Sequence, residues 1–299
     1  MNAPIKPALL NLRAAVETSP PPLDFVLPGL LAGTVGALVS QGGAGKTMAA
    51  LELAIRTTTG LDLLEIESLC DSQLPTGNVA YLTSEDPAEV LAHRMHAMGK
   101  TIPQNVRETL YERLSIAPLN GMRTDVMSSV WQAWITDIAK NSRLVIIDTL
   151  RRFHVSDEND GGAMAELMGW FEALCHETRT TVLFLHHSSK AGALAGGDTQ
   201  QAARGSSVLT DNARWQCNLV GMSEKEATKF EGISDHRHYV RLIFAKYNYV
   251  APIPDVWLRR STGGVLVPAR LEPAQTKDDK KAARAYARAS NGGYADGDY

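Results

Sequence analysis

The sequence predicts an α/β fold in which a mostly parallel central sheet carries helices on both faces. Apolar strings of strand length, at 35–39, 77–83 and 143–149, alternate along the chain with segments of helical pattern. Polar residues directly follow several of these strings, and in open α/β sheets ligands bind at those carboxyl ends. A glycine-rich loop between the first of these strings and a helix points to the same class of fold.

The glycine-rich loop, residues 40–47, reads Ser-Gln-Gly-Gly-Ala-Gly-Lys-Thr. Its glycines let several backbone N–H groups face one point, and the helix that follows at 48–56 adds the positive end of its dipole. Lys46 supplies a mobile cation, and Thr47 offers a hydroxyl to Mg²⁺. These features predict a cradle for a triphosphate. The usual motif begins with Gly, whereas this chain has Ser40 there, and the alternative is an ordinary glycine-rich turn.

The predicted phosphate ligands are the consecutive residues of this loop and the first residues of its helix. They are Gly42, Gly43, Ala44, Gly45, Lys46, Thr47 and Met48.

Composition sets limits on class and location. The chain has 299 residues, of which 44% are hydrophobic and 21% charged, as in an ordinary globular protein. Its net charge of −3 means that any nucleic-acid contact must come from a local patch. Cys70, Cys175 and Cys217 are too scattered for a disulfide framework or a zinc cluster, which favours a cytoplasmic protein. We expect neither a signal peptide nor a membrane span.

Three segments organise the chain. Residues 1–19 are expected to form an arm with a short amphipathic helix at 8–16, followed by the extended spacer Pro20-Pro21-Pro22. Residues 20–272 are expected to form one domain, which begins with an apolar lead-in expected to pack beside the nucleotide strand. Residues 273–299 are polar, and we expect them to be disordered.

The strand at 77–83 delivers two acids at its carboxyl end. Glu85 is a candidate general base for activating water, although it could instead only cap a helix. Asp86 is expected to cap the helix at 88–98. On that helix, Arg94 faces either a phosphate or solvent.

Two later strands carry further candidates. The apolar string at 143–149 contains Asp148, whose carboxylate is expected to hold Mg²⁺ through water. The string beginning at Thr181 ends in His186-His187, and a histidine at this point can sense the terminal phosphate by hydrogen bonding. The alternative is a histidine pair packed at a strand end.

The segment 191–203 is rich in Gly, Ala and Gln, and we expect it to be a mobile loop. Lys190 and Arg204 flank it. Cations at a flexible loop on the ligand edge suit a DNA backbone, although the segment could simply be disordered.

The remaining pattern predicts more helices and strands. Trp131 and Trp134, on one of these helices, are expected in the core. The expected helices are 106–113, 125–140, 163–179 and the start of 204–215, and the expected strands are 215–220, 239–246 and 256–259, with turns at 252–254 and 263–264.

Taken together, these strings resemble the RecA-type P-loop ATPases and, more closely, the RepA-type hexameric replicative helicases of IncQ plasmids. The resemblance runs from about Pro20 to Pro268. The strings that carry it are Val35–Thr47, Tyr81-Leu82 with Glu85-Asp86-Pro87, the Asp-Thr-Leu-Arg-Arg-Phe-His string at 148–154, His186-His187 and Arg204–Trp215.

The resemblance implies ATP and Mg²⁺ as ligands and gives each candidate a role. Lys46 and Thr47 would hold phosphate and Mg²⁺, and Asp148 would belong to the metal shell. Glu85 would orient or deprotonate the attacking water, and His187 would sense the terminal phosphate.

Two arginines also receive roles from the resemblance. Arg214 would reach the neighbouring subunit's site as an arginine finger, and Arg94 would be a further phosphate contact. Ring helicases often carry a Lys-x-Arg pair on a late strand. Lys246-Tyr247-Asn248 keeps only the Lys, so the cation acting in trans would be Arg214 or Arg204.

The implied function is ATP-driven translocation on single-stranded DNA by a hexameric ring, with 5′-to-3′ polarity, during plasmid or phage replication. A replication initiator or a primase would be its partner. Two alternatives stay open: a recombination or repair ATPase that binds DNA without unwinding it, and a nucleotide-gated DNA-binding regulator. Unwinding of forked duplexes separates the helicase from both alternatives.

Overall fold

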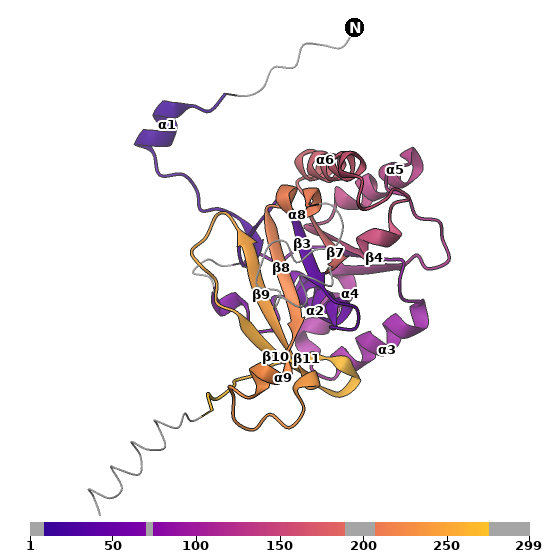
Figure 1. Cartoon of the computed structure of the whole chain (residues 1–299). Helices are drawn as coiled ribbons and strands as arrows, with labels where there is room; N and C mark the ends of the chain where they lie inside the picture. The colour runs from indigo at the N-terminus through magenta and orange to yellow at the C-terminus, as the bar shows by residue number, and fades with distance from the viewer. Residues whose placement is uncertain (1–8, 70–73, 189–206, 275–299) are drawn as a thin grey trace, which may run out of the picture.

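The computed structural model describes residues 9–69, 74–188 and 207–274 (Figure 1). Four of the features expected above fall outside these ranges: Lys190, Arg204, the loop at 191–203 and nearly all of the tail. They therefore stay predictions.

In the described residues, nine strands form one sheet in the order β11-β10-β9-β8-β3-β7-β6-β4-β5. The six strands from β8 to β5 in this order are parallel, whereas β9, β10 and β11 extend the sheet antiparallel. The expected mostly parallel sheet is therefore confirmed. The bounds are β3 (Val35–Ser40), β4 (Val79–Thr83), β5 (Leu114–Pro118), β6 (Leu144–Asp148), β7 (Thr181–His187), β8 (Trp215–Gly221), β9 (Tyr239–Tyr247), β10 (Val256–Arg260) and β11 (Leu266–Pro268).

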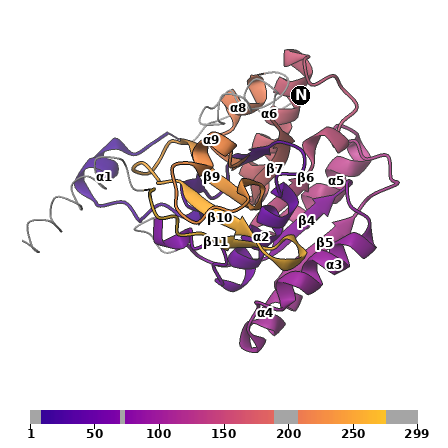
Figure 2. The same cartoon turned by 60° about the horizontal axis from the view of Figure 1, so that its bottom comes forward.

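Helices cover both faces of the sheet, as expected (Figure 2). One face packs against α2, α3 and α4, and the other against α5, α6 and α8. The helices are α2 (Lys46–Thr59), α3 (Ala88–Gly99), α4 (Arg107–Arg113), α5 (Ser129–Ala139), α6 (Gly161–Thr178), α8 (Val208–Asn212) and α9 (Glu224–Ala227). Short 3₁₀ helices are η1 (Glu67–Leu69), η2 (Gln104–Val106), η3 (Leu150–Arg152), η5 (His236–His238) and η6 (Thr262–Gly264).

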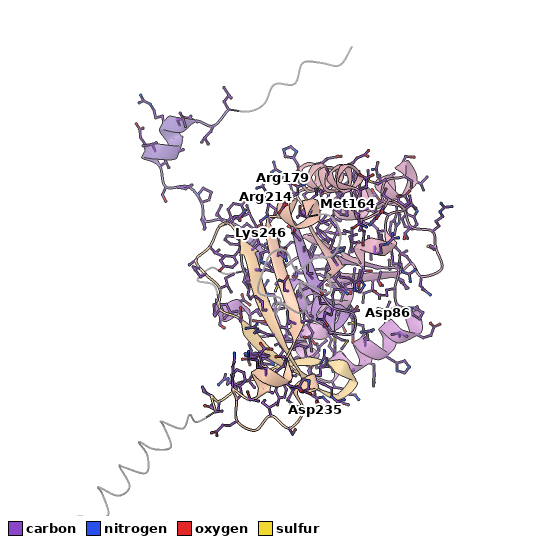
Figure 3. The ribbon with its side chains drawn as sticks, in the orientation of Figure 1. Asp86, Met164, Arg179, Arg214, Asp235 and Lys246 are labelled. Carbon is purple, nitrogen blue, oxygen red and sulfur yellow. The ribbon has the colours of Figure 1, made fainter. Side chains whose placement is uncertain are left out.

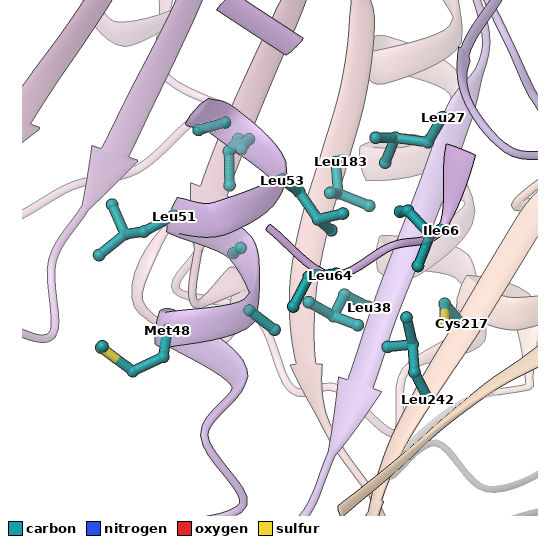
Figure 4. Close-up of a cluster of buried hydrophobic side chains, with 14 of the residues drawn as sticks. Leu27, Leu38, Met48, Leu51, Leu53, Leu64, Ile66, Leu183, Cys217 and Leu242 are labelled. Carbon is teal, nitrogen blue, oxygen red and sulfur yellow. The ribbon is translucent and has the colours of Figure 1, made fainter. Parts of the chain in front are cut away.

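Strand β3 explains why the core has two halves. Its side chains alternate, so Val35, Ala37 and Val39 join the cluster under α5 and α6, while Leu38 joins the cluster under α2. Figure 4 shows Leu38 among the apolar side chains of α2 and the neighbouring strands. A strand buried on both faces must be apolar throughout, which is the pattern read from the sequence.

Parallel register brings the predicted polar strand ends to one edge. Ser40 on β3 pairs with His187 on β7, and Thr83 on β4 pairs with Asp148 on β6. Because β6 and β7 are themselves neighbours, all four residues lie at the same edge of the sheet.

Three local expectations need correction. Helix α5 begins at Ser129 rather than at Asp125, because the Asp125 carboxylate accepts a hydrogen bond from the Met127 N–H and forms a turn. Trp131 packs against the core, but Trp134 is 37% exposed, so only one of the two tryptophans meets its expectation. Residues 114–118, for which no strand was expected, form edge strand β5.

The amino-terminal part of the described chain has two elements. Helix α1 (Leu12–Glu17) stands apart from the body (Figure 1), and none of its residues is buried. A hairpin of β1 (Phe25–Leu27) and β2 (Leu30–Leu31) then packs into the α2 side of the core, as expected for the lead-in. No helix in the described ranges is long and apolar enough to cross a bilayer.

Candidate functional site

The loop between β3 and α2 has the backbone that its glycines permit. Gly43 and Gly45 have φ angles of +75° and +99°, a region that side-chain-bearing residues rarely adopt. Gly45 is the N-cap of α2, so Lys46 and Thr47 are the first residues of the helix. The N–H groups of this first helical turn have no partner within the helix and can donate to an anion.

Ser40 explains the departure from the usual motif. It is the last residue of β3, is buried, and does not have a positive φ angle. Its hydroxyl donates to the Gln41 carbonyl at 2.9 Å, and its carbonyl accepts from the Ser188 N–H at 2.8 Å. Because the backbone here is ordinary strand, glycine is not required at this position.

Lys46 and Asp148 form the polar floor of the site. Only 6% of Lys46 is exposed. Burial lowers the pKa of Lys46, although the charges of Asp148 and Glu85 oppose this shift. Burial likewise raises the pKa of Asp148, against a hydrogen bond from Tyr81 and the charge of Lys46. Both groups have lost most of their water, so each gains from an additional ion of opposite charge.

The oxygens around Asp148 fit a magnesium ion. Thr47 Oγ1 and the Tyr81 hydroxyl both donate to Oδ2 of Asp148, at 2.9 and 2.6 Å. The other oxygen, Oδ1, is buried and has no hydrogen-bond partner in the described residues. Mg²⁺ prefers oxygen ligands and binds through one or two carboxylates plus water and phosphate, which agrees with this set.

A cavity of about 340 Å³ opens above this floor. It brings together most of the predicted residues. Ala44 and Asp148 are buried and do not line it, and Asp148 is linked to it through the hydrogen bond from Thr47, a lining residue. The lining residues are Gln41, Gly42, Gly43, Gly45, Lys46, Thr47, Met48, Glu85, Asp86, Arg94, His187, Arg260 and Gly264.

His187 lines the cavity from the end of β7 and is half-buried. Burial and the charge of Lys46 lower its pKa, while the charge of Glu85 opposes this shift. A neutral imidazole is therefore favoured near pH 7, and it can donate one hydrogen bond to an anion.

Asp86 and Arg94 interact with each other across the first turns of α3. Their side chains form an ion pair at 2.8 Å. The N-cap of α3 is Pro87, with no side-chain hydrogen bond, so the expected capping role of Asp86 is wrong. The guanidinium offers the carboxylate a charge-assisted bond instead. Arg94 lines the cavity, but it already has an ionic partner in Asp86, which lies just before α3 begins.

Arg214 lies at the other edge of the sheet. Its N–H donates to the carbonyl of Val35, the first residue of β3, whereas Lys46 follows the far end of β3. Six strand residues separate these edges, about 20 Å at 3.3 Å per residue. Figure 3 shows exposed Arg214 close to Lys246 and far from Asp86. Lys246 donates to the backbone carbonyls of Thr210 and Asp211.

The sequence interpretation missed Arg260, Gly264 and the role of Tyr81. Tyr81 lies inside an apolar strand and is completely buried, so only the structure reveals that its hydroxyl reaches Asp148. Arg260 and Gly264 come from the antiparallel end of the sheet, about two hundred residues after the loop. The available signal in the sequence was the pair Arg259-Arg260 ahead of a glycine turn. That pattern does not indicate where β10 lies in the sheet.

Known proteins resemble this chain in sequence or in fold. Residues 5–193 match the family model described as "AAA domain". Among solved structures, one described as an ATPase domain has a TM-score of 0.56 and 16% identity, covering 87% of this chain and 96% of that one. A KaiC-like protein from the archaeon Pyrococcus horikoshii has a TM-score of 0.54 and 15% identity, covering 82% and 94%.

A DnaB-like replicative helicase, described with its primase interactions, has a TM-score of 0.54 and 16% identity, covering 80% of this chain and 58% of that one. At such identities these structures establish the fold alone, and they confirm the expected RecA-like P-loop class. The matched family model covers more than half of the sequence, and the chain therefore belongs to the AAA domain family.

Proposed function

We propose that this chain is an ATPase that binds ATP in the cavity above Lys46. One observation carries the proposal: Thr47, Tyr81 and Asp148 form a hydrogen-bonded set at the base of a cavity lined by Lys46 and Glu85. In and beside the cavity, Lys46 thus supplies a cation, Thr47 and Tyr81 supply two hydroxyls, and Glu85 and Asp148 supply two carboxylates. Phosphoryl transfer needs little else from a protein, because its catalysis is positioning and charge neutralisation.

The reaction is ATP + H₂O → ADP + phosphate. A water oxygen forms a bond to the terminal phosphorus, while the bond from that phosphorus to the bridging oxygen breaks. Glu85 accepts the proton that the water loses. Lys46 and the N–H groups at the start of α2 neutralise the phosphate oxygens, and His187 donates to the terminal phosphate. Mg²⁺, held by Thr47 and Asp148, would neutralise charge on the phosphates when bound.

The proposal extends to a hexameric replicative helicase of the RepA type, moving 5′ to 3′ on single-stranded DNA in plasmid or phage replication. The resemblance of the sequence strings supports it, and so does the likeness of the fold to a DnaB-like replicative helicase. Its partners would be an initiator or a primase. A cytoplasmic location is part of the proposal, supported by the free thiols of Cys175 and Cys217.

ATP hydrolysis, measured with and without single-stranded DNA, tests the proposal together with unwinding of a forked duplex. We expect DNA to stimulate hydrolysis and the fork to open only with ATP and Mg²⁺. DNA-stimulated hydrolysis without unwinding would favour the recombination or repair ATPase. Hydrolysis indifferent to DNA would favour the nucleotide-gated regulator, and the absence of hydrolysis would remove the ATPase itself.

Arg214 is proposed to act in trans on the ATP of the next subunit. Its exposed position at the edge opposite Lys46 supports this role, because it cannot serve the site of its own chain. Arg214→Ala should retain ATP binding and lose about 10³-fold or more in turnover. Mixed rings of Arg214→Ala and Lys46→Ala subunits should recover hydrolysis above both parents. No recovery in rings shown to co-assemble would contradict the assignment.

The arm is proposed to dock on an adjacent subunit. Leu12 and Val16 on α1, together with Leu9 and Leu10 before it, are each at least 70% exposed, and this helix is too short to be stable alone. A neighbour would remove these side chains from water. Deleting residues 1–19 should lower the oligomer mass measured by sedimentation, whereas an undisturbed oligomer would count against docking.

A further inference from the structure

Arg260 contacts the backbone of the phosphate-binding loop from the far end of the sequence. It is the last residue of β10, and its Nη2 donates to the carbonyl of Ala44 at 2.7 Å and to that of Gly43 at 3.3 Å. Its Nη1 donates to the Arg237 carbonyl. The family match ends at residue 193, so neither Arg260 nor its strand belongs to the matched part.

These contacts orient the N–H groups of the loop. A peptide group is planar and trans, so its carbonyl and the following N–H point in opposite directions. Holding the Ala44 carbonyl therefore holds the Gly45 N–H pointing away from the guanidinium. Holding the Gly43 carbonyl orients the Ala44 N–H, which donates to the Gln41 carbonyl at 3.3 Å and closes the turn.

The loop needs such support because of its composition. Gly42, Gly43 and Gly45 give it many backbone states, and an added Cβ at Gly42 or Gly43 would meet no atom within 4 Å. Packing around the Cβ positions of these two glycines therefore does not restrict these states. A guanidinium has several donors in a rigid plane and can hold two consecutive carbonyls, which a lysine ammonium does less well.

The hairpin that carries Arg260 is itself anchored to the helix after the loop. Glu52 on α2 is fully buried, and its Oε1 accepts from the Leu266 N–H at 2.8 Å. Gly264 lies against Met48 of α2. Figure 2 shows β10 and β11 beside α2. Arg260 therefore contacts the loop from a strand whose place relative to α2 is set by packing and a buried hydrogen bond.

We propose that Arg260 is a positioning residue that holds the phosphate-binding loop in its ligand-binding conformation. The inference rests on the proposed function, since it concerns the same cavity. Loop N–H groups bind the α- and β-phosphates, whereas the lysine of the loop reaches the β- and γ-phosphates. Loss of Arg260 should therefore weaken ADP and ATP to the same extent, and loss of Lys46 should weaken ATP more than ADP.

The experiment measures ADP and ATP affinity of the full chain by titration calorimetry, with thermal melting of each variant. Arg260→Ala should raise both Kd values by a similar factor, about 10- to 100-fold. Arg260→Lys should restore part of this loss because it keeps one donor. The matched control is Arg259→Ala, which removes an exposed neighbour on the same strand and should leave both affinities unchanged.

Each other outcome overturns the inference. Unchanged affinities in a folded Arg260→Ala protein, with or without a lower melting temperature, would make the residue merely structural. A loss confined to ATP would mean direct contact with the terminal phosphate. If Arg260→Ala does not fold, the same comparison is made with Arg260→Lys, for which wild-type affinities would overturn the proposal. Failure of the wild-type chain to bind nucleotide would instead remove the proposed function.

Discussion

The parallel and antiparallel parts of the sheet contribute to the cavity in different ways. Parallel strands β3, β4, β6 and β7 send their carboxyl ends to one edge, so polar residues that follow them meet. In the antiparallel part direction reverses at each strand. Lys246 near the end of β9 and Arg260 at the end of β10 consequently lie at opposite edges. A strand-end residue can thus be assigned to the site by sequence only where the strands are known to be parallel.

We expect the largest effect on hydrolysis at Lys46, which follows the parallel strand β3. Lys46→Ala removes the cation facing the terminal phosphates while leaving β3 intact, so hydrolysis should fall by about 10³-fold or more. Steady-state ATPase rates measure this, and circular dichroism checks the fold. Lys100→Ala, which removes an exposed lysine at the end of α3, is the control. Normal hydrolysis by Lys46→Ala would contradict the view that the parallel part of the sheet supplies the groups needed for hydrolysis.

Glu85→Gln tests the carboxylate at the end of β4. The amide keeps the shape and removes the base, so turnover should fall about 10²- to 10⁴-fold while ATP binding persists. Single-turnover hydrolysis combined with nucleotide titration separates these two quantities. Asp86→Asn is the neighbouring control, because Asp86 pairs with Arg94 and is given no part in the chemistry. Equal losses in both variants would argue against a general base.

Tyr81→Phe tests the buried part of the site, where the Tyr81 hydroxyl contacts Asp148. It removes one of the two hydroxyls that donate to Oδ2 of Asp148. Hydrogen bonds to charged groups contribute about 1.5–3 kcal/mol, so the Mg²⁺ concentration for half-maximal hydrolysis should rise roughly tenfold or more. Tyr111→Phe, at an exposed tyrosine, is the control. An unchanged Mg²⁺ dependence would leave Tyr81 as a packing residue only.

The last test concerns Glu52, which joins the two parts through Leu266. Burial raises the pKa of Glu52 to about 8, against the opposing hydrogen bond from the Leu266 N–H. The folded chain then holds a proton that the unfolded chain releases above pH ~4.5. Stability contributed by this group is therefore full below that pH and is lost as pH rises toward 8, at up to about 1.4 kcal/mol per pH unit.

Glu52→Gln keeps an acceptor for the Leu266 N–H and does not titrate. The free energy of unfolding of this variant, relative to wild type, should rise with pH between about 5 and 8. Urea unfolding at several pH values measures the difference, and Glu67→Gln on the partly exposed partner of Arg56 serves for comparison. A difference independent of pH would show that Glu52 is ionised in the folded chain.

The sequence by itself determined much of this protein. Glycine spacing and the Lys46-Thr47 pair predicted the loop and the start of α2, because backbone freedom and helix starts depend on neighbouring residues. Uninterrupted apolar strings predicted strands buried on both faces, and parallel register then brought Glu85, Asp148 and His187 together. These inferences hold because each depends on short spacings or on one rule of topology.

Only the tertiary structure decided contacts between side chains distant in sequence. Asp86 pairs with Arg94 instead of capping α3, and Tyr81 reaches Asp148 from inside an apolar strand. Arg260 contacts the loop because two reversals of strand direction return β10 to the edge of β3. No local sequence pattern encodes how often the strand direction reverses or how far a side chain such as that of Arg260 extends. Such contacts depend on how the helices and strands pack against one another. A polar group that becomes buried by this packing forms its hydrogen bond with a partner that lies close to it.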